Sequence, residues 1–241
     1  MKQPDIHLYT ASTMNGWKPV IFLEEAGVDY DLTSIDFSKK EQKSDWYLKI
    51  NPNGRIPAII DRSQGDFAVF ESGAVLWYLA EKYGKFLSDD PKIRSETLQW
   101  LMFQMGGLGP MMGQAMYFQR IAAPNGNEIP FAIDRYMAET RRLFEVLNTR
   151  LEGRDWLAGE AFSIADIATY PWARAYYWAQ VSIDGLPHLQ AWFDRIDARE
   201  ATRRALEIPK PFWAFFGKGD VAKAEAANAA RFKADGRHKK A

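Results

Sequence analysis

The sequence predicts an α/β domain followed by an all-α domain, and three observations support this division. Strand and helix signals alternate over the first 84 residues. From about residue 92 the apolar residues follow helical spacing almost to the end, and strand signals stop. Between these parts runs "KFLSDDPK" (85–92), a polar stretch whose composition is typical of a connection.

The chain opens with a predicted strand and helix. "IHLYT" (6–10) alternates apolar and polar residues, as a half-buried strand does. "NGWKPVIFLEEAG" (15–27) has apolar residues at helical spacing and ends at Gly27, a typical C-cap. "YDLTSIDF" (30–37) is predicted to form a second strand, and the polar segment through "EQKSDWYLKI" (41–50) a helical piece.

Two short strands and a helix complete the first domain. "PAIID" (57–61) and "FAVF" (67–70) are predicted strands joined by the turn-rich "RSQGD". "SGAVLWYLAEKYG" (72–84) is a predicted helix with Ser72 as its N-cap and Gly84 at its end. The order βαβαββα predicts a mixed four-stranded sheet flanked by helices.

The second domain is predicted to be entirely helical, over residues 93–109, 129–153, 163–180 and 186–200. Ser163 and Asp166 form an S-x-x-D capping box, which defines where the third of these helices begins and stabilises it by about 1 kcal/mol. The predicted boundaries are 1–85 for the α/β domain, 91–207 for the helical domain and 208–241 for an Ala/Lys-rich extension. We expect that extension to be partly helical or disordered.

Composition excludes several classes of function. Lys+Arg and Asp+Glu balance at 31 each, which argues against a general nucleic-acid or anionic-membrane surface. Cysteine is absent, so disulfides, thiolate metal sites and a cysteine nucleophile are excluded. The three histidines lie far apart, so we expect no metal. Without a signal peptide or an apolar run of membrane-spanning length, the protein is expected in the cytosol.

The order of motifs resembles that of the cytosolic glutathione transferases over about residues 5–205. "TMNG" after the first strand, "NPNGRIPAIID", "FESGAVLWYLAEK" and "WLMFQMGGLGPMMGQ" are similar to the nu class of that family. The resemblance implies a thioredoxin-like N-terminal domain, a helical glutathione-transferase C-terminal domain and a homodimer. It also implies a site for glutathione, the tripeptide γ-Glu-Cys-Gly, in the cleft between the domains.

The resemblance implies catalytic roles for Thr13 and Asn15, which follow the first strand. Hydrogen bonds from both to the glutathione sulfur would favour the thiolate, the reactive form of a thiol whose free pKa is about 8.5. Tyr9 lies inside the strand and is not assigned the tyrosine role of other classes. A simpler interpretation of Asn15 is an N-cap in an Asn-Gly turn.

Five further residues are implied to bind glutathione within the same chain. The family's proline, here Pro57, follows a cis peptide bond, and the backbone of Ile56 pairs with the cysteinyl unit as a short strand would. An edge-strand or turn proline is the alternative. Ser72, at a helix N-terminus, is expected to hold the γ-glutamyl carboxylate and Glu71 the ammonium, although Ser72 could simply cap its own helix. Gln42 is expected near the glycyl end.

Arg135, on a long helix at the expected dimer interface, would reach glutathione in the partner's site, unless it is a solvated or intrahelically paired arginine. Trp17 lies close to the expected sulfur position in sequence and is a further candidate. Some of the aromatic and Met residues of the helical domain are expected to line the pocket for the second substrate; the candidates are Trp100, Phe103, Met111, Met112, Tyr117 and Phe118.

The leading functional hypothesis is a glutathione-dependent disulfide-bond oxidoreductase with weaker conjugation of electrophiles. Its expected partners are glutathione and a small disulfide or hydrophobic electrophile. Because the chain has no cysteine, the electrons must come from glutathione thiols. Two alternatives remain: a glutathione-dependent aryl-ether lyase, which uses the same sulfur site, and a non-catalytic glutathione-binding regulatory protein.

Overall fold

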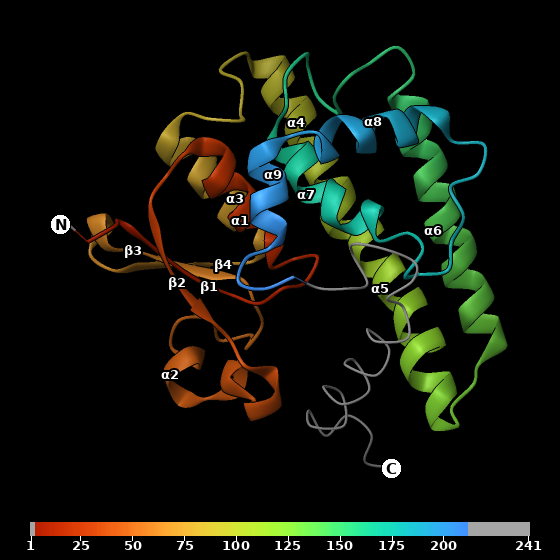
Figure 1. Cartoon of the computed structure of the whole chain (residues 1–241), viewed down its shortest axis with the longest axis horizontal. Helices are drawn as coiled ribbons and strands as arrows, with labels where there is room; N and C mark the ends of the chain where they lie inside the picture. Colours follow the sequence, from red (N-terminus) through yellow and green to blue (C-terminus); the bar gives the residue numbers. More distant parts are fainter. Residues whose placement is uncertain (1–2, 212–241) are drawn as a thin grey trace.

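The computed structural model describes residues 3–211. Within that range an α/β unit lies beside a helical unit, with the sheet on one side of the molecule and helices α5 and α6 on the other (Figure 1). The predicted extension, 208–241, lies outside the described residues from position 212 onward.

The sheet has the strand order β2-β1-β3-β4, formed by β2 (Tyr30–Ser34), β1 (Ile6–Thr10), β3 (Ala58–Asp61) and β4 (Phe67–Phe70). Strand β1 runs parallel to β2, with Leu8 opposite Leu32, and antiparallel to β3, with Leu8 opposite Ile59. Strands β3 and β4 form an antiparallel hairpin. This is the mixed four-stranded sheet that the order of motifs predicts.

The two faces of the sheet bury different sets of side chains, because alternate strand residues point in opposite directions. Ile6, Leu8 and Ile59 are fully buried in the main core, which also takes in α1 (Trp17–Ala26) and α3 (Ser72–Tyr83). On the other face, Tyr9 and Ala58 form a smaller cluster with Tyr47 of the short helix α2 (Asp45–Leu48). Tyr9 is therefore a packing residue.

The helical unit consists of α4 (Pro91–Phe103), α5 (Gly109–Tyr117), α6 (Pro130–Arg150), α7 (Ile164–Arg174), α8 (Pro187–Asp197) and α9 (Glu200–Leu206). Two π-helical segments, Gln104–Leu108 and Phe118–Ala122, flank α5. The helix predicted over 93–109 thus changes to wider turns at Gln104. Such π segments are rare and often lie at functional sites.

Helix α7 is at the centre of this unit, and ten of its eleven residues are buried. Its predicted capping box is confirmed: the Ser163 hydroxyl accepts from the Ala165 N–H, and the Asp166 carboxylate accepts from the Ser163 N–H at 3.0 Å. Asp166 also accepts from the N–H of Leu157 and from the indole of Trp192 in α8. One carboxylate therefore joins the start of α7 to a loop and to a second helix.

The helix ends around the sheet are partly as predicted. Gly27 and Gly84 close α1 and α3 in the left-handed conformation, with φ of 64° and 61°. The prediction of Ser72 as the N-cap of α3 is wrong. Glu71 occupies that position with φ of 71°, and Ser72 is the first helical residue. The Ser72 side chain is turned inward, where its hydroxyl accepts from the Lys18 ammonium, and it does not cap the helix.

The last described residues return to the first domain. The carboxylate of Glu25 in α1 accepts from Arg199 at 2.6 and 3.0 Å and from the Thr202 hydroxyl at 2.7 Å. The Trp17 indole donates to the Ile208 carbonyl at 3.1 Å. Trp17, a further candidate from the sequence, is fully buried and packs in the core.

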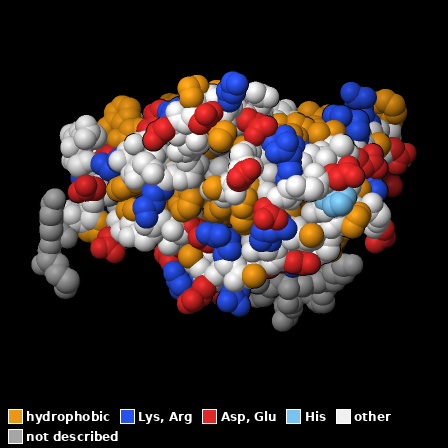
Figure 2. Space-filling view, turned by 90° about the horizontal axis from the view of Figure 1, so that it is seen from above, with side chains coloured by type: hydrophobic (Ala, Val, Ile, Leu, Met, Phe, Trp, Pro, Cys, Tyr) orange, Lys and Arg blue, Asp and Glu red, His pale blue; other side chains and the backbone are white. Residues whose placement is uncertain are grey.

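No helix among residues 3–211 has the length and apolarity needed to cross a membrane. Figure 2 shows one face of the molecule, on which acidic and basic side chains are interspersed.

Candidate active site

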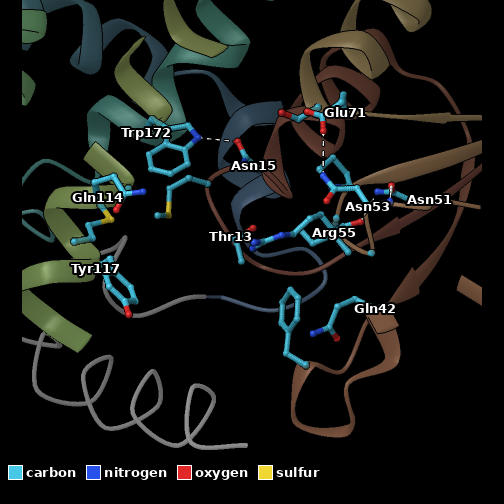
Figure 3. A pocket seen from close by; sticks show the side chains of 18 of the residues that line it. Thr13, Asn15, Gln42, Asn51, Asn53, Arg55, Glu71, Gln114, Tyr117 and Trp172 are labelled. Carbon is cyan, nitrogen blue, oxygen red and sulfur yellow. Dashed lines mark hydrogen bonds between the residues drawn. The ribbon is translucent and has the colours of Figure 1, made fainter. Parts of the chain in front are cut away.

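A cavity of about 1020 Å³ lies between the α/β unit and the helical unit. Figure 3 shows its two sides: Gln42, Asn51, Asn53, Arg55 and Glu71 belong to the α/β unit, while Gln114, Tyr117 and Trp172 come from the helices opposite. Seven of the eight residues predicted for the site line this cavity: Thr13, Asn15, Gln42, Ile56, Pro57, Glu71 and Ser72. Arg135 does not; it lies exposed on α6.

The loop after β1 brings Thr13 and Asn15 to the cavity through a tight turn. The Thr10 hydroxyl donates to the Gly16 carbonyl at 2.8 Å, and the Gly16 N–H donates to Thr13 Oγ1 at 3.1 Å. A Cβ at position 16 would lie 1.9 Å from the Ala11 carbonyl oxygen, so only glycine fits there. The N-cap of α1 is Gly16, and the simpler interpretation of Asn15 as an N-cap is therefore wrong.

Both side chains face the cavity as donors, because their acceptor oxygens already have protein partners. Thr13 Oγ1 accepts from Gly16, which leaves its own hydrogen for another acceptor. Asn15 Oδ1 accepts from the Trp172 indole at 2.8 Å, drawn as a dashed line in Figure 3. Trp172 therefore fixes the orientation of the Asn15 amide and leaves its Nδ2 hydrogens available. Both residues of this loop thus offer a hydrogen-bond donor at the cavity lining.

The segment "NPNGRIP" (51–57) is held from behind by buried side chains. The Arg55 carbonyl accepts from the Tyr47 hydroxyl at 2.6 Å and from the Asn51 amide at 2.7 Å. The Ile56–Pro57 peptide bond is cis, as the resemblance implies. Ile56 lies just before β3, and its backbone has no backbone hydrogen bond to any other described residue. The polar groups of Ile56 are thus available to a ligand in the cavity.

Glu71 and Ser72 lie at the start of α3 and have very different surroundings. Glu71 is exposed, and its positive φ is uncommon for a residue other than glycine. Strained backbone of this kind concentrates at functional sites. The Asn53 amide lies 3.5 Å from Glu71 Oε1. Ser72 is only 4% exposed, and its hydroxyl accepts from the Lys18 ammonium at 3.1 Å.

Gln42 borders the opposite end of the cavity, on a 3₁₀ turn that lies against the "NPNG" loop. Gly54 has a φ of 60°, and a Cβ there would lie 2.7 Å from the Gln42 carbonyl oxygen. The Gln42 side chain is buried, and its Oε1 has no hydrogen-bond partner among residues 3–211. A buried acceptor of this kind is costly unless a donor reaches it. A ligand N–H in the cavity is one such donor.

The helical side of the cavity differs from the expected wall. Of the six aromatic and Met candidates only Tyr117 is among the lining residues. Met112 is fully buried in the core, and Trp100 and Phe103 pack against the core. Trp172, Trp178 and Arg120 line the cavity instead, and the Arg120 guanidinium lies 3.8 Å from the centre of the Trp178 ring. Arg120 belongs to the second π segment, and sequence spacing gave no signal for this placement.

The charged residues of the lining are Lys40, Lys43, Arg55 and Arg120 on the positive side and Glu71 on the negative side. This excess of positive charge favours an anionic ligand. Within residues 3–211 there is no group of three or more His, Asp or Glu side chains that could hold a metal ion.

Lys18 is the main polar residue that the sequence prediction missed. It is fully buried and donates to Ser72 Oγ, to Gln104 Oε1 at 2.5 Å and towards the Met105 sulfur at 3.3 Å. Burial lowers the pKa of Lys18 to about 7, whereas the Glu71 carboxylate acts in the opposite direction. A sequence signal was present: Lys18 is a charge within the apolar run "WKPVIFL" of a helix predicted to pack on the sheet.

Two family models match the chain. The glutathione S-transferase N-terminal domain matches residues 4–81, and the glutathione S-transferase C-terminal domain matches residues 117–200. The disulfide-bond oxidoreductase YfcG of Escherichia coli (strain K12) is 50% identical over 205 residues, which cover 83% of this chain and 94% of YfcG.

Two solved structures are similar in sequence and in fold. A glutathione transferase from Pseudomonas putida, with one glutathione disulfide bound per subunit, superimposes with a TM-score of 0.80 at 42% identity. The match covers 87% of this chain and 94% of that one. A glutathione transferase family member from Pseudomonas fluorescens pf-5, with two glutathione bound, superimposes with a TM-score of 0.79 at 42% identity. That match covers 84% of this chain and 92% of the other.

Proposed function

The chain belongs to the glutathione S-transferase family, and on that premise we propose that it is a glutathione-dependent disulfide-bond oxidoreductase. The observation that carries this proposal is the pair of donors, Thr13 and Asn15, at one end of an interdomain cavity in a chain without cysteine. The 50% identity to a disulfide-bond oxidoreductase supports the same activity. The protein acts in the cytosol in this proposal, where a reducing pool of glutathione supplies the thiols.

Glutathione lies extended along the α/β side of the cavity in this proposal. Its cysteinyl unit pairs with the backbone of Ile56 before Pro57, as an added strand would. The γ-glutamyl carboxylate meets the Ser72 hydroxyl and the N–H groups at the start of α3, and Glu71 pairs with the ammonium. Gln42 lies towards the glycyl end. The excess positive charge of the lining supports binding of this anionic tripeptide.

The sulfur then lies beside Thr13 and Asn15, whose hydrogens stabilise the thiolate. The thiolate attacks one sulfur of the substrate disulfide, a glutathione–substrate disulfide forms, and the other half leaves as a thiolate that takes up a proton. A second glutathione thiolate attacks the glutathione sulfur of that mixed disulfide and releases the remaining half. Two glutathione molecules are thereby oxidised to glutathione disulfide, and one substrate disulfide is reduced to two thiols.

A homodimer is part of the proposal, with Arg135 reaching the partner's glutathione. Its support is local: Phe131, 78% exposed, lies four residues before Arg135 and thus on the same face of α6. An interface over this face would cover Phe131 and bring Arg135 to the second chain.

A second candidate activity, thiolate cleavage of aryl ethers, is favoured by the aromatic groups of Tyr117, Trp172 and Trp178 on the helical side of the cavity. It uses the same sulfur site, so substrate preference distinguishes the two activities. Weaker conjugation of electrophiles is also expected.

The test is turnover with glutathione and three substrates: 2-hydroxyethyl disulfide, chlorodinitrobenzene and a model β-aryl ether. The proposal predicts the highest kcat/KM for the disulfide, with glutathione disulfide formed in equal amount to the disulfide consumed. A preference for the ether would support the lyase. Glutathione binding without turnover of any of the three would instead indicate a regulatory protein and contradict the proposal.

A further inference from the structure

We propose that Lys18 is the positioning residue behind the glutathione site: its buried ammonium holds the Ser72 hydroxyl as a donor and supplies the positive charge that the ligand's γ-glutamyl carboxylate meets. This inference rests on the proposed function and deepens it. It assigns a role to a side chain that does not itself line the cavity.

The first support is hydrogen-bond direction. An ammonium can only donate, so Ser72 Oγ must accept from Lys18 at 3.1 Å. The hydroxyl hydrogen of Ser72 must then point elsewhere, and its protein acceptor is the Met105 sulfur at 3.6 Å, a weak one. A carboxylate in the cavity is a much stronger acceptor. Lys18 therefore prepares Ser72 to donate to an anion.

The second support is charge. Lys18 is fully buried, and its partners Ser72, Gln104 and Met105 are all neutral. Glu71 is the one charged group whose field is found to act on Lys18 among residues 3–211, and it is exposed. An ammonium buried without a close counter-ion is costly. A carboxylate bound at Ser72 would supply that counter-ion at the distance of one hydroxyl group.

The third support is the fit of the surrounding residues, which come from both domains. Gln104 and Met105 belong to the first π segment, whereas Lys18 and Ser72 belong to α1 and α3. A Cβ at Gly109 would lie 2.7 Å from Gln104 Nε2, and one at Gly73 would lie 2.9 Å from Met105 Cγ. Two glycines thus make room for the two side chains that contact the ammonium.

The pH dependence follows from the Lys18 pKa of about 7. Above that pH much of the free protein has a neutral Lys18. A bound carboxylate raises the pKa of Lys18, so ligand binding at pH 8 takes up a proton. At pH 6 Lys18 is already protonated before the ligand binds, so binding takes up no proton at this residue. Proton uptake at the higher pH alone is what a base shows when its pKa is low in the free protein and rises on binding.

The test compares the wild type with Lys18→Met, and with Lys18→Met/Gln104→Leu, which also removes the acceptor left behind by the first change. Lys85→Met, a change at an exposed lysine outside the cavity, is the matched control. Calorimetry with S-hexylglutathione in buffers of different ionisation enthalpy measures affinity and proton uptake together. S-hexylglutathione has no free thiol that could release a proton. Its own ammonium can exchange protons on binding, and the Lys18 variants measure that contribution separately.

We expect both Lys18 variants to bind about ten- to hundredfold more weakly and to lack the extra proton uptake at pH 8. In turnover with glutathione we expect a higher KM and a nearly unchanged kcat at saturation. Lys85→Met should match the wild type. Equal affinity and equal proton uptake in wild type and in either folded Lys18 variant would overturn the inference. If none of the proteins, wild type included, binds, then the proposed function itself fails.

Discussion

At the residue scale, the candidate chemistry depends on which atoms of Thr13 and Asn15 remain available. Each side chain carries both a donor and an acceptor, and the fold uses the acceptor of each. The Gly16 N–H occupies Thr13 Oγ1, and the Trp172 indole occupies Asn15 Oδ1. Donors fixed in place before a ligand arrives are worth more than mobile ones, since no reorganisation is needed when charge develops.

We predict that Thr13→Ala and Asn15→Ala each lower kcat for disulfide reduction by about ten- to hundredfold, the worth of one hydrogen bond to a charged group. The KM for glutathione should change less, because the tripeptide's other contacts remain. Steady-state kinetics with varied glutathione separates the two parameters.

Trp172→Phe is an informative companion, because it keeps an aromatic ring and removes the indole donor that orients Asn15. The kcat of Trp172→Phe for disulfide reduction should lie between those of the wild type and Asn15→Ala. Equal losses in binding and turnover for the two alanine variants would argue that these residues only support the loop.

The residues of the site could be predicted from sequence where a motif carries them, and not elsewhere. Thr13, Pro57 and Ser72 stand in short recognisable stretches, and all three line the cavity. Lys18 shows in the sequence only as a charge within an apolar helical run, and Arg120 reaches the site because a π segment and the packing of the two domains bring it there. The spacing of residues along one helix does not contain that information. The sequence does not distinguish Ser72 as the first helical residue from Ser72 as an N-cap, because the two positions differ only in backbone angles.

At the element scale, α7 supports the cavity from the helical side. It carries Trp172, which orients Asn15, and its start is fixed by Asp166. Four donors converge on that buried carboxylate: the N–H and hydroxyl of Ser163, the N–H of Leu157 and the Trp192 indole. Loss of the carboxylate would leave several buried donors unsatisfied at once.

Asp166→Ala should therefore lower the free energy of unfolding by about 3 kcal/mol or more, since each unsatisfied buried donor costs about 1–3 kcal/mol. Ser163→Ala, which removes only the cap hydroxyl, should cost about 1 kcal/mol. Urea denaturation followed by tryptophan fluorescence gives both values. A smaller loss of unfolding free energy for Asp166→Ala than for Ser163→Ala would contradict the role of this carboxylate in joining α7 to the loop at Leu157 and to α8.

Elements were more predictable than their details. The strands at 6–10 and 67–70 and the glycine ends of α1 and α3 follow from alternation and from turn chemistry. The change from α to π geometry at Gln104 does not, because "QMGGL" is compatible with either helix and the choice is made by packing. Of the six candidates for the helical wall, Tyr117 alone lines the cavity. Once the helix register changes at the π segments, residues spaced for one helix face no longer lie on that face.

At the scale of the whole molecule, the two units form one structure in which the cavity depends on both. The main core runs from Ile6 and Leu8 of the sheet through α1 and α3 to Tyr170 and Trp172 of α7. The Glu25–Arg199 pair ties α1 to the segment just before α9, the last helix described. Separation of the units would therefore open both the core and the cavity, so we expect them to unfold together.

The proposed dimer gives the prediction at this scale. Sedimentation equilibrium should give twice the chain mass of 27.6 kDa. Arg135→Ala should keep that mass and raise the KM for glutathione roughly tenfold, through loss of one charge-assisted contact. Arg142→Ala is the control, because Arg142 lies on the same helix and pairs with Glu139. A 27.6 kDa species at assay concentrations, or equal effects of the two substitutions, would contradict the role of Arg135.

The most direct measurement is the ultraviolet absorbance of the thiolate of glutathione bound to the wild type, followed as pH is lowered from 8.5. Because the chain has no cysteine, no protein thiol contributes to this signal. If Thr13 and Asn15 donate to the sulfur, the bound thiol will ionise at least one pH unit below its free pKa of about 8.5, and each alanine variant will move it back towards that value. Ionisation of bound glutathione at its free pKa, unchanged by either substitution, would contradict the central claim.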